Sequence, residues 1–361
     1  MTLANVAPGR DLYGTGAGLL VDEFYAPADV TITGGTIAGN DATNYFGGGL
    51  AVVRDSGVAG RALVVRLDGT TVAGNTNELP AGGLLAAGGG IFLREGTLTL
   101  TNATIAGNTA PHGGGIYNQG GSLTIVGGTI RDNTATGAGG GLSIHGTATL
   151  TDVTIRDNTA LGAGGGGLWS TYVNVTLRGV TLSGNTASNG AGGAISHVGG
   201  TTSLADSTVS GNAARSGGGI AVGIYGTVAA SFATIVGNRA TASGGGIYAA
   251  GEDTKRAAAL LDRSVVAGNL VGAAAQDCAV NAYGGVASGG YNLVGGAGGC
   301  PANGAGDVSL ITPLAGALAP ALADNGGPTR THNVVPGGPA HNRIPASTCP
   351  LSGDQRGVVR P

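Results

Sequence analysis

The sequence contains few charged and few aromatic residues. Charged side chains make up 10% of the 361 residues and aromatic side chains 4%. With a net charge of −3 and an isoelectric point near 5.9, the chain lacks the basic surface by which proteins bind nucleic acid. Glycine, threonine, asparagine or aspartate interrupts every apolar stretch well before the ~18 residues that a membrane-spanning helix needs. We therefore expect neither a nucleic-acid partner nor a transmembrane segment.

Cysteine is also scarce, and the first residues carry no export signal. Cys278, Cys300 and Cys349 all lie in the last quarter, without the pairwise spacing of a zinc site, so we expect no metal and no cofactor. In a secreted chain two of them would close a loop, and we favour Cys278 with Cys300; the alternative is three reduced, buried thiols. MTLANVAPGRDLYG has neither the basic start nor the apolar core of a signal peptide. Because LANVA already resembles the middle of a repeat, we expect the natural precursor to begin further upstream.

Glycine, in contrast, is abundant. It accounts for 75 of 361 residues, against a usual share of roughly 7%. A hydrophobic fraction of 42% and the absence of charge runs argue against a disordered chain. The glycines must therefore recur in a pattern.

The pattern is a repeat of about 26 residues. Its marker is an asparagine three residues after Ile, Val or Leu, and it occurs at Asn40, Asn75, Asn108, Asn133, Asn158, Asn185, Asn212, Asn238 and Asn269. A threonine precedes the marker by four residues in eight of the nine copies, and apolar and polar residues alternate ahead of it. Such alternation is typical of half-buried strands, and a third apolar segment follows each glycine run. Each copy is therefore predicted to form three short strands.

One copy cannot bury its own apolar row, but stacked copies can, with each strand paired in parallel to its equivalent in the next copy. The sequence predicts an all-β fold, a right-handed parallel β-helix of about nine to ten coils over residues 1–270. We expect the glycine runs to form a corner where side chains do not fit. The marker asparagines are expected to point inward at the opposite corner, where their amides can hydrogen-bond to one another.

The repeat motifs resemble a known family. GGAI occurs at residues 192–195, GGGI or GGGL occurs in other copies, and the marker reads IAGN, IRDN, LSGN, VSGN and IVGN. These motifs resemble the GGAI and FxxN repeats of the chlamydial polymorphic outer-membrane proteins, over roughly residues 30–270. ADNGGPTRTH (323–332), DQRG (354–357) and YNLVG resemble the choice-of-anchor Q region of bacterial surface proteins. The resemblance implies an exported, adhesin-like protein at the cell surface, with residues 271–361 as an irregular C-terminal capping region.

Catalytic candidates are weak. Enzymes that cleave polysaccharides on this fold need convergent carboxylates or a calcium-binding acidic cluster. The nearest approach is Arg131, Asp132, Arg156 and Asp157, which occupy equivalent turns of neighbouring copies and equally fit a solvated charge ladder. His197 occupies a position that is apolar in other copies, so we expect a core histidine with a hydrogen-bond partner.

One outward column is unusually aromatic. If the residue after each glycine run points inward, the next one points outward, and that column reads Phe92, Tyr117, Ser143, Trp169, Ser196, Ala221 and Tyr248. Aromatic rows suit the apolar faces of sugar rings, another surface partner, or simple packing. We predict ligand binding at Phe92, Tyr117, Trp169 and Tyr248.

The function predicted from these features is a secreted or cell-surface scaffold, extracellular and monomeric. It would bind a polysaccharide or a component of a host or neighbouring cell surface without catalysing a reaction. The alternative is a polysaccharide-active enzyme, a lyase or a glycoside hydrolase, on the same fold.

Overall fold

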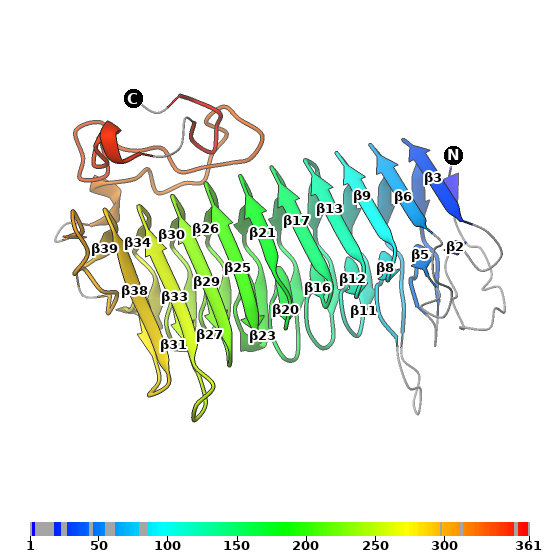
Figure 1. Ribbon diagram of the computed structural model, residues 1–361, viewed down its shortest axis with the longest axis horizontal. Coiled ribbons are helices and arrows are strands. Elements are labelled where there is room, and N and C mark those ends of the chain that lie inside the picture. Colours follow the sequence, from blue (N-terminus) through cyan, green and yellow to red (C-terminus); the bar gives the residue numbers. More distant parts are fainter. Residues whose placement is uncertain are drawn as a thin grey trace.

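The computed structural model describes residues 2–3, 18–22, 27–42, 46–54, 62–78, 86–296, 298–310, 313–349 and 353–359. The chain winds into a long stack of coils, and the C-terminal segment returns along one side of it (Figure 1). Each complete coil passes through sheets B, C, A and D in that order. The predicted right-handed parallel β-helix of about nine to ten coils is confirmed.

Most strands of sheet A end two residues before a marker asparagine, and most strands of sheet B follow a glycine run. Within the described residues sheet A has twelve strands: β1 (Thr2–Leu3), β4 (Thr36–Ala38), β7 (Thr71–Ala73), β10 (Thr104–Ala106), β14 (Thr129–Arg131), β18 (Thr154–Arg156), β22 (Thr181–Ser183), β26 (Thr208–Ser210), β30 (Thr234–Val236), β34 (Val265–Ala267), β39 (Leu293–Gly295) and β40 (Val308–Leu310). Sheet B, counted over the same ranges, has ten: β2 (Leu19–Asp22), β5 (Leu50–Val53), β8 (Ile91–Arg94), β12 (Ile116–Gln119), β16 (Leu142–Ile144), β20 (Leu168–Thr171), β24 (Ile195–Val198), β28 (Ile220–Val222), β32 (Ile247–Ala249) and β37 (Cys278–Val280).

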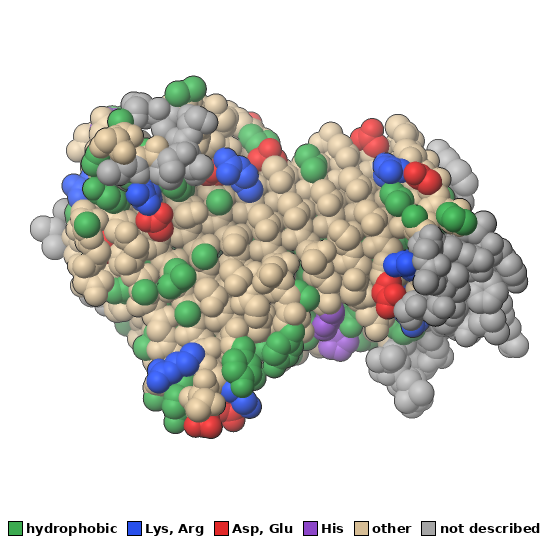
Figure 2. Space-filling model, viewed as in Figure 1, with side chains coloured by type: hydrophobic (Ala, Val, Ile, Leu, Met, Phe, Trp, Pro, Cys, Tyr) green, Lys and Arg blue, Asp and Glu red, His purple; other side chains and the backbone are tan. Residues whose placement is uncertain are grey.

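Sheet C is the broad face at the front of Figure 1. In the part of the chain that the structure describes it has ten strands: β3 (Ala28–Thr33), β6 (Leu63–Asp68), β9 (Thr97–Thr101), β13 (Ser122–Val126), β17 (Thr147–Thr151), β21 (Val175–Arg178), β25 (Gly200–Ala205), β29 (Gly226–Ser231), β33 (Ala257–Asp262) and β38 (Gly284–Gly290). The centre of this face carries few charged side chains (Figure 2).

Sheet D was not predicted. Its described strands are β11 (Thr109–Ala110), β15 (Thr134–Ala135), β19 (Thr159–Ala160), β23 (Thr186–Ala191), β27 (Ala213–Ser216), β31 (Arg239–Ser243), β35 (Leu270–Val271) and β36 (Ala274–Ala275). It begins directly after the marker asparagine. Its first strands are only two residues long, too short to show a period of two in the sequence. The fold therefore has four strands per coil in its middle, where the repeat predicted three.

Strand pairing keeps the repeat in register. Ile105 pairs with Ile130, and Ile130 with Ile155, so identical side chains stack from coil to coil. All three are buried and belong to one apolar core that runs through the coils. Because a shift by one residue would turn every apolar side chain outward, this core fixes the register.

The marker asparagines form the predicted inner ladder. In each step the backbone N–H and the side-chain Nδ2 of one asparagine donate to Oδ1 of the next, and the eight Nδ2···Oδ1 distances lie between 2.8 and 3.0 Å. Nδ2 also donates to a carbonyl of the preceding coil, as from Asn158 to Ile130 at 3.0 Å. The prediction that these amides point inward and bond to one another is confirmed.

The glycine runs form a corner, as expected, but this corner lies beside the asparagine ladder and not opposite it, because a Cβ added at Gly141 would lie 3.2 Å from the Asn158 side chain. At Gly140 an added Cβ would lie 2.5 Å from the carbonyl oxygen of Gly166 and 2.5 Å from backbone atoms of Thr159. The coils can approach this closely only because no side chain stands between them.

The C-terminal segment lies against the outer face of sheet A (Figure 1). It includes the short 3-10 helices η1 (Leu314–Gly316) and η2 (Ala346–Thr348). Thr181 Oγ1 donates to the carbonyl of Arg330 at 2.7 Å, and Thr208 Oγ1 donates to Gln355 Oε1 at 2.8 Å. Strands β37 to β40 continue the sheets past residue 270, so the stacked strands reach Leu310 before this segment begins.

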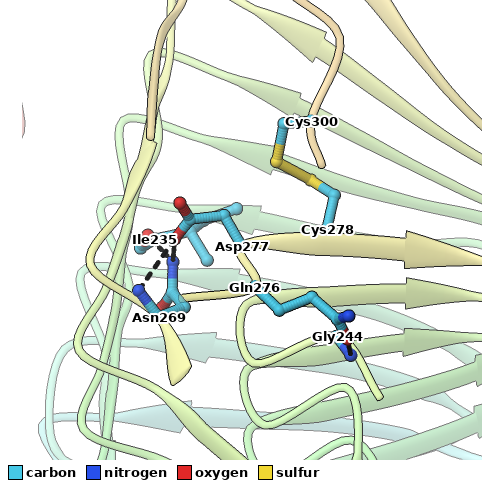
Figure 3. Close-up of a disulfide and its surroundings, with 7 residues drawn as sticks. All are labelled: Ile235, Gly244, Asn269, Gln276, Asp277, Cys278 and Cys300. Atoms are coloured by element: carbon cyan, nitrogen blue, oxygen red, sulfur yellow. Dashed lines mark hydrogen bonds between the residues drawn. A yellow bond between two sulfur atoms is a disulfide. The ribbon is translucent and has the colours of Figure 1, made fainter. Parts of the chain in front are cut away.

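An aspartate and a disulfide close the end of the ladder (Figure 3). Asp277 Oδ1 accepts hydrogen bonds from the backbone N and from Nδ2 of Asn269, both at 2.7 Å. The next residue, Cys278, forms a disulfide with Cys300 across a sequence separation of 22, with 4.8 Å between the Cα atoms. The favoured pairing is therefore confirmed, and Cys349 lies outside this disulfide.

We expect Asp277 to make stability depend on pH. Burial raises its pKa to about 6 from the ordinary 3.8, although the hydrogen bonds from Asn269 oppose this shift. The folded protein therefore binds this proton more tightly than the unfolded chain does. Its contribution to the free energy of unfolding is complete below about pH 4 and is lost as the pH rises through 6. At about 1.4 kcal/mol per pKa unit, the loss is on the order of 3 kcal/mol.

The variant Asp277→Asn keeps the accepting Oδ1 but cannot ionise. Chemical denaturation between pH 4 and 8 should show this variant to be more stable than the unmodified protein at pH 8, with the difference shrinking toward pH 4. A stability difference between the two proteins that stays constant over this pH range would contradict the raised pKa of Asp277. Asp253→Asn, at an exposed turn, serves as the control.

Candidate functional site

Aromatic rings gather on the outer face of sheet B. Ring centroids are 4.4 Å apart between Phe46 and Phe92, and 5.8 Å apart between Phe92 and Tyr117. The His145 imidazole continues the row, 5.1 Å from Tyr117 and 5.1 Å from Trp169. Three of the four predicted binding residues thus belong to one continuous stack.

The stack differs from the predicted outward row in two ways. Phe92 is fully buried, because Phe46 and Tyr117 cover it, so its ring is not accessible to a ligand. Tyr248 is half-buried and does not join the others, since Ser196 and Ala221 occupy the two intervening coils. Of the predicted residues, Tyr117 and Trp169 are the half-exposed pair within the stack.

Two further tyrosines extend this surface at the turns from sheet B into sheet C, and neither was among the predicted binding residues. Tyr172 is 66% exposed and Tyr225 is 53% exposed. Hydrophobic side chains gather along this edge, at the bottom of Figure 2. We call the accessible residues together the aromatic surface; they are Tyr117, His145, Trp169, Tyr172 and Tyr225.

The backbone at these two tyrosines is unusual. Tyr172 and Tyr225 have φ angles of 52° and 57°, in the left-handed region that bulky residues avoid at a cost of about 1–2 kcal/mol. The equivalent of Tyr172 in the next coil is Gly199, and the Tyr172 ring occupies the space where a Cβ of Gly199 would lie. Tyrosine at a turn that suits glycine is the sequence signal that could have identified this edge.

Burial favours the neutral form of two rings in the aromatic surface, His145 and Tyr117. Burial lowers the pKa of His145, and the charge of His112 lowers it further. Burial also raises the pKa of Tyr117, which keeps its hydroxyl protonated. His145 Nδ1 lies 3.3 Å from Thr171 Oγ1 and its Nε2 lies 3.4 Å from Ser143 Oγ, contacts that orient the ring. The surface can therefore offer apolar ring faces and neutral hydrogen-bonding groups.

The four charged candidates form two exposed ion pairs. Arg131 pairs with Asp132 at 2.5 Å, and Arg156 pairs with Asp157 at 2.6 Å. Both aspartates have positive φ, at a turn position that is glycine in other coils, and aspartate tolerates this conformation. Each carboxylate thus has its own arginine, in a repeated turn open to solvent.

His197 is the core histidine that was expected. It is fully buried, and its Nδ1 lies 2.9 Å from Ser170 Oγ and 3.1 Å from Thr202 Oγ1. Burial lowers its pKa, although a hydrogen bond with the backbone of Gly200 opposes the shift. It serves packing inside the coils and is closed to ligands.

A cleft of about 420 Å³ lies between the C-terminal segment and the last coils. One wall contains Phe232, Arg263 and Tyr291, which follow one another in successive coils at the turn from sheet C into sheet A. The Arg263 guanidinium lies 5.9 Å from the Phe232 ring centre and 5.7 Å from that of Tyr291. No motif in the sequence indicated this cleft, because its second wall comes from the C-terminal segment, which lies outside the repeats.

No three His, Cys, Asp or Glu side chains of the described residues come together in a way that could hold a metal ion. None of the helices that the structure describes has the length and apolar character for crossing a membrane.

Comparison with known proteins identifies a matching family. The family model described as "Right handed beta helix region" matches residues 15–214 and, in an overlapping second alignment, residues 89–267. No curated protein and no solved structure matches the chain significantly.

Proposed function

Because the chain belongs to the right-handed β-helix family, we propose that it is a non-catalytic surface scaffold that binds a glycan through its aromatic surface. Within this family the fold alone does not decide between binding and catalysis. The choice rests on the side chains that the coils present to solvent.

The observation that carries the proposal is the exposed ring of Tyr172. A bulky residue held in a left-handed conformation is strained, and such strain persists where function requires it. The ring covers the glycine turn of the next coil and remains 66% exposed. This exposed aromatic platform directly follows β20, the strand that carries Trp169, and such a platform suits the apolar face of a sugar ring.

Two features support export to the cell surface. A disulfide such as Cys278–Cys300 persists in oxidising compartments and is rare in the cytosol. The repeats resemble those of the polymorphic outer-membrane proteins, and the tail resembles the choice-of-anchor Q region. In the structure the two tail motifs meet, since Gln355 Nε2 donates to Thr329 Oγ1 at 2.9 Å.

The alternative, a polysaccharide lyase or glycoside hydrolase, has less support from the charged candidates. General acid or nucleophile roles need carboxylates that converge on one substrate bond. Asp132 and Asp157 are exposed, and each is bonded to the arginine next to it in the chain.

The test uses Trp169, the only tryptophan in the chain. Its fluorescence emission is titrated with a panel of soluble polysaccharides, and we expect a saturable shift with at least one. Tyr172→Ala should weaken that binding about fivefold, the order expected for one aromatic contact. Leu260→Ala removes a comparably exposed side chain from sheet C and should bind as the unmodified protein does.

Two outcomes would count against the proposal. If no polysaccharide moves the Trp169 emission, or if Tyr172→Ala binds with unchanged affinity, the aromatic surface is not a glycan site. The same mixtures are assayed for new reducing ends and unsaturated products. Their accumulation would favour the enzyme.

A further inference from the structure

The cleft beneath the C-terminal segment has the dimensions of a ligand site. Its volume of about 420 Å³ falls within the ~300–1,000 Å³ of small-molecule pockets. Stacked turns of the β-helix make one wall, and the C-terminal segment makes the other. Most of the side chains that line it are polar, and Tyr291, Val334 and Ile344 add apolar surface.

The wall of stacked turns has an unusual backbone. Phe232, Arg263 and Tyr291 have φ angles of 52°, 49° and 56°. The equivalent turn positions in the four preceding coils are Gly127, Asp152, Gly179 and Asp206, residue types that tolerate this conformation. The change to bulky residues thus occurs in three successive coils, and it coincides with the cleft. Local strain concentrated at one concave surface points to function.

The charge of the cleft is predominantly positive. Three guanidiniums, from Arg263, Arg343 and Arg356, line it against the single carboxylate of Asp354. Arg356 binds Asp354 at 2.5 Å, and Arg263 is paired with Asp262 outside the cleft at 2.5 Å. These two arginines are therefore already neutralised.

Arg343 is different. It is exposed, and its guanidinium contacts the carbonyl of Gly306 at 3.4 Å, with no ion pair to any described residue. A guanidinium matches a carboxylate through two parallel hydrogen bonds. Arg343 is thus the group available to bind an anionic ligand in this cleft.

We propose that the cleft binds an acidic sugar, with the ligand's carboxylate on Arg343, its hydroxyls among the polar side chains of the lining, and its ring against Tyr291. A uronic acid combines the features that the lining requires, namely one carboxylate, several hydroxyls and a compact ring with an apolar face. This site is separate from the aromatic surface on sheet B, and it shares no residue with it.

The probe is D-glucuronic acid, compared with D-glucose, because the two differ only in the carboxylate. Ligand-observed saturation-transfer NMR on the full chain at neutral pH should detect glucuronate and not glucose. Arg343→Gln should weaken glucuronate binding about tenfold, since it removes a charge-assisted pair. Arg330→Gln is the matched control, because Arg330 is exposed in the same segment but does not line the cleft.

Three results would overturn the inference. They are equal signals from glucose and glucuronate, unchanged binding by Arg343→Gln, or displacement of glucuronate by acetate at equal concentration, which would show a site for any carboxylate. Because Trp169 reports the aromatic surface alone, a failure at this cleft leaves the glycan titration unaffected, and the reverse also holds.

Discussion

Replacing Asn158 with alanine is expected to destabilise the protein by about 4 kcal/mol. The side chain makes four buried hydrogen bonds: it accepts two from Asn133 and donates to Asn185 and to Ile130. Its loss leaves the backbone N–H and one Nδ2 hydrogen of Asn133 without acceptors, in a site that water does not reach. Each unsatisfied buried group costs about 1–3 kcal/mol.

Guanidinium denaturation followed by circular dichroism measures this loss, and native-state hydrogen exchange shows where it acts. Because each coil contacts only its neighbours, exchange should rise first in the coils that carry Asn133 and Asn185. Asn189→Ala provides the control, since Asn189 is exposed and makes one bond, to the carbonyl of Leu161. Equal losses in the two variants would show that the ladder adds nothing beyond an ordinary surface contact.

Replacing Gly140 with alanine should be at least as damaging, again about 4 kcal/mol or more. Overpacking usually costs about 1–3 kcal/mol because side chains can move aside. Here the added Cβ meets the backbone of Thr159 and Gly166 at 2.5 Å. These atoms cannot rotate away, since Gly140 N donates to the carbonyl of Gly165 at 3.1 Å and so fixes the spacing of the coils.

Thermal unfolding and the yield of soluble protein report this effect. Gly285→Ala is the matched control, because Gly285 lies in β38 without a positive φ and the nearest atom to its added Cβ is 4.0 Å away. That variant should be neutral or slightly more stable, since alanine restricts the unfolded chain. A Gly140→Ala protein that unfolds at the same temperature as Gly285→Ala would refute the close-packed corner.

The repeat made most of the fold predictable because stacked coils use each position in the same way. The columns that contain Ile130 and Asn133 could be assigned from spacing alone, and the pairing register follows them. Sheet D escaped prediction because two residues such as Thr134 and Ala135 carry no periodic signal. Strands this short form because they pair with equivalent strands in neighbouring coils, and their own sequence carries no signal.

The candidate sites were less predictable because they depend on contacts between distant segments. Phe92 lies outside the main core, in a smaller cluster where Phe46 from the preceding coil covers it, and the repeat pattern did not indicate that contact. The cleft exists only because Thr181 and Thr208 hold the C-terminal segment against sheet A across some 150 residues of sequence. A repeat pattern describes what neighbouring coils share and contains no information on such docking.

The asparagine ladder gives the molecule a direction. Every hydrogen bond between neighbouring amides points from an earlier coil to a later one, so each new coil receives donors and must supply an acceptor. An asparagine side chain accepts hydrogen bonds from the coil before it and donates one to the coil after it. The side chain of Asp277 accepts but has no N–H to donate. The aspartate thus ends the ladder of identical asparagine hydrogen bonds. Whole coils can be added or lost ahead of it while the last link stays satisfied, which lets evolution change the length of the solenoid without redesigning its end.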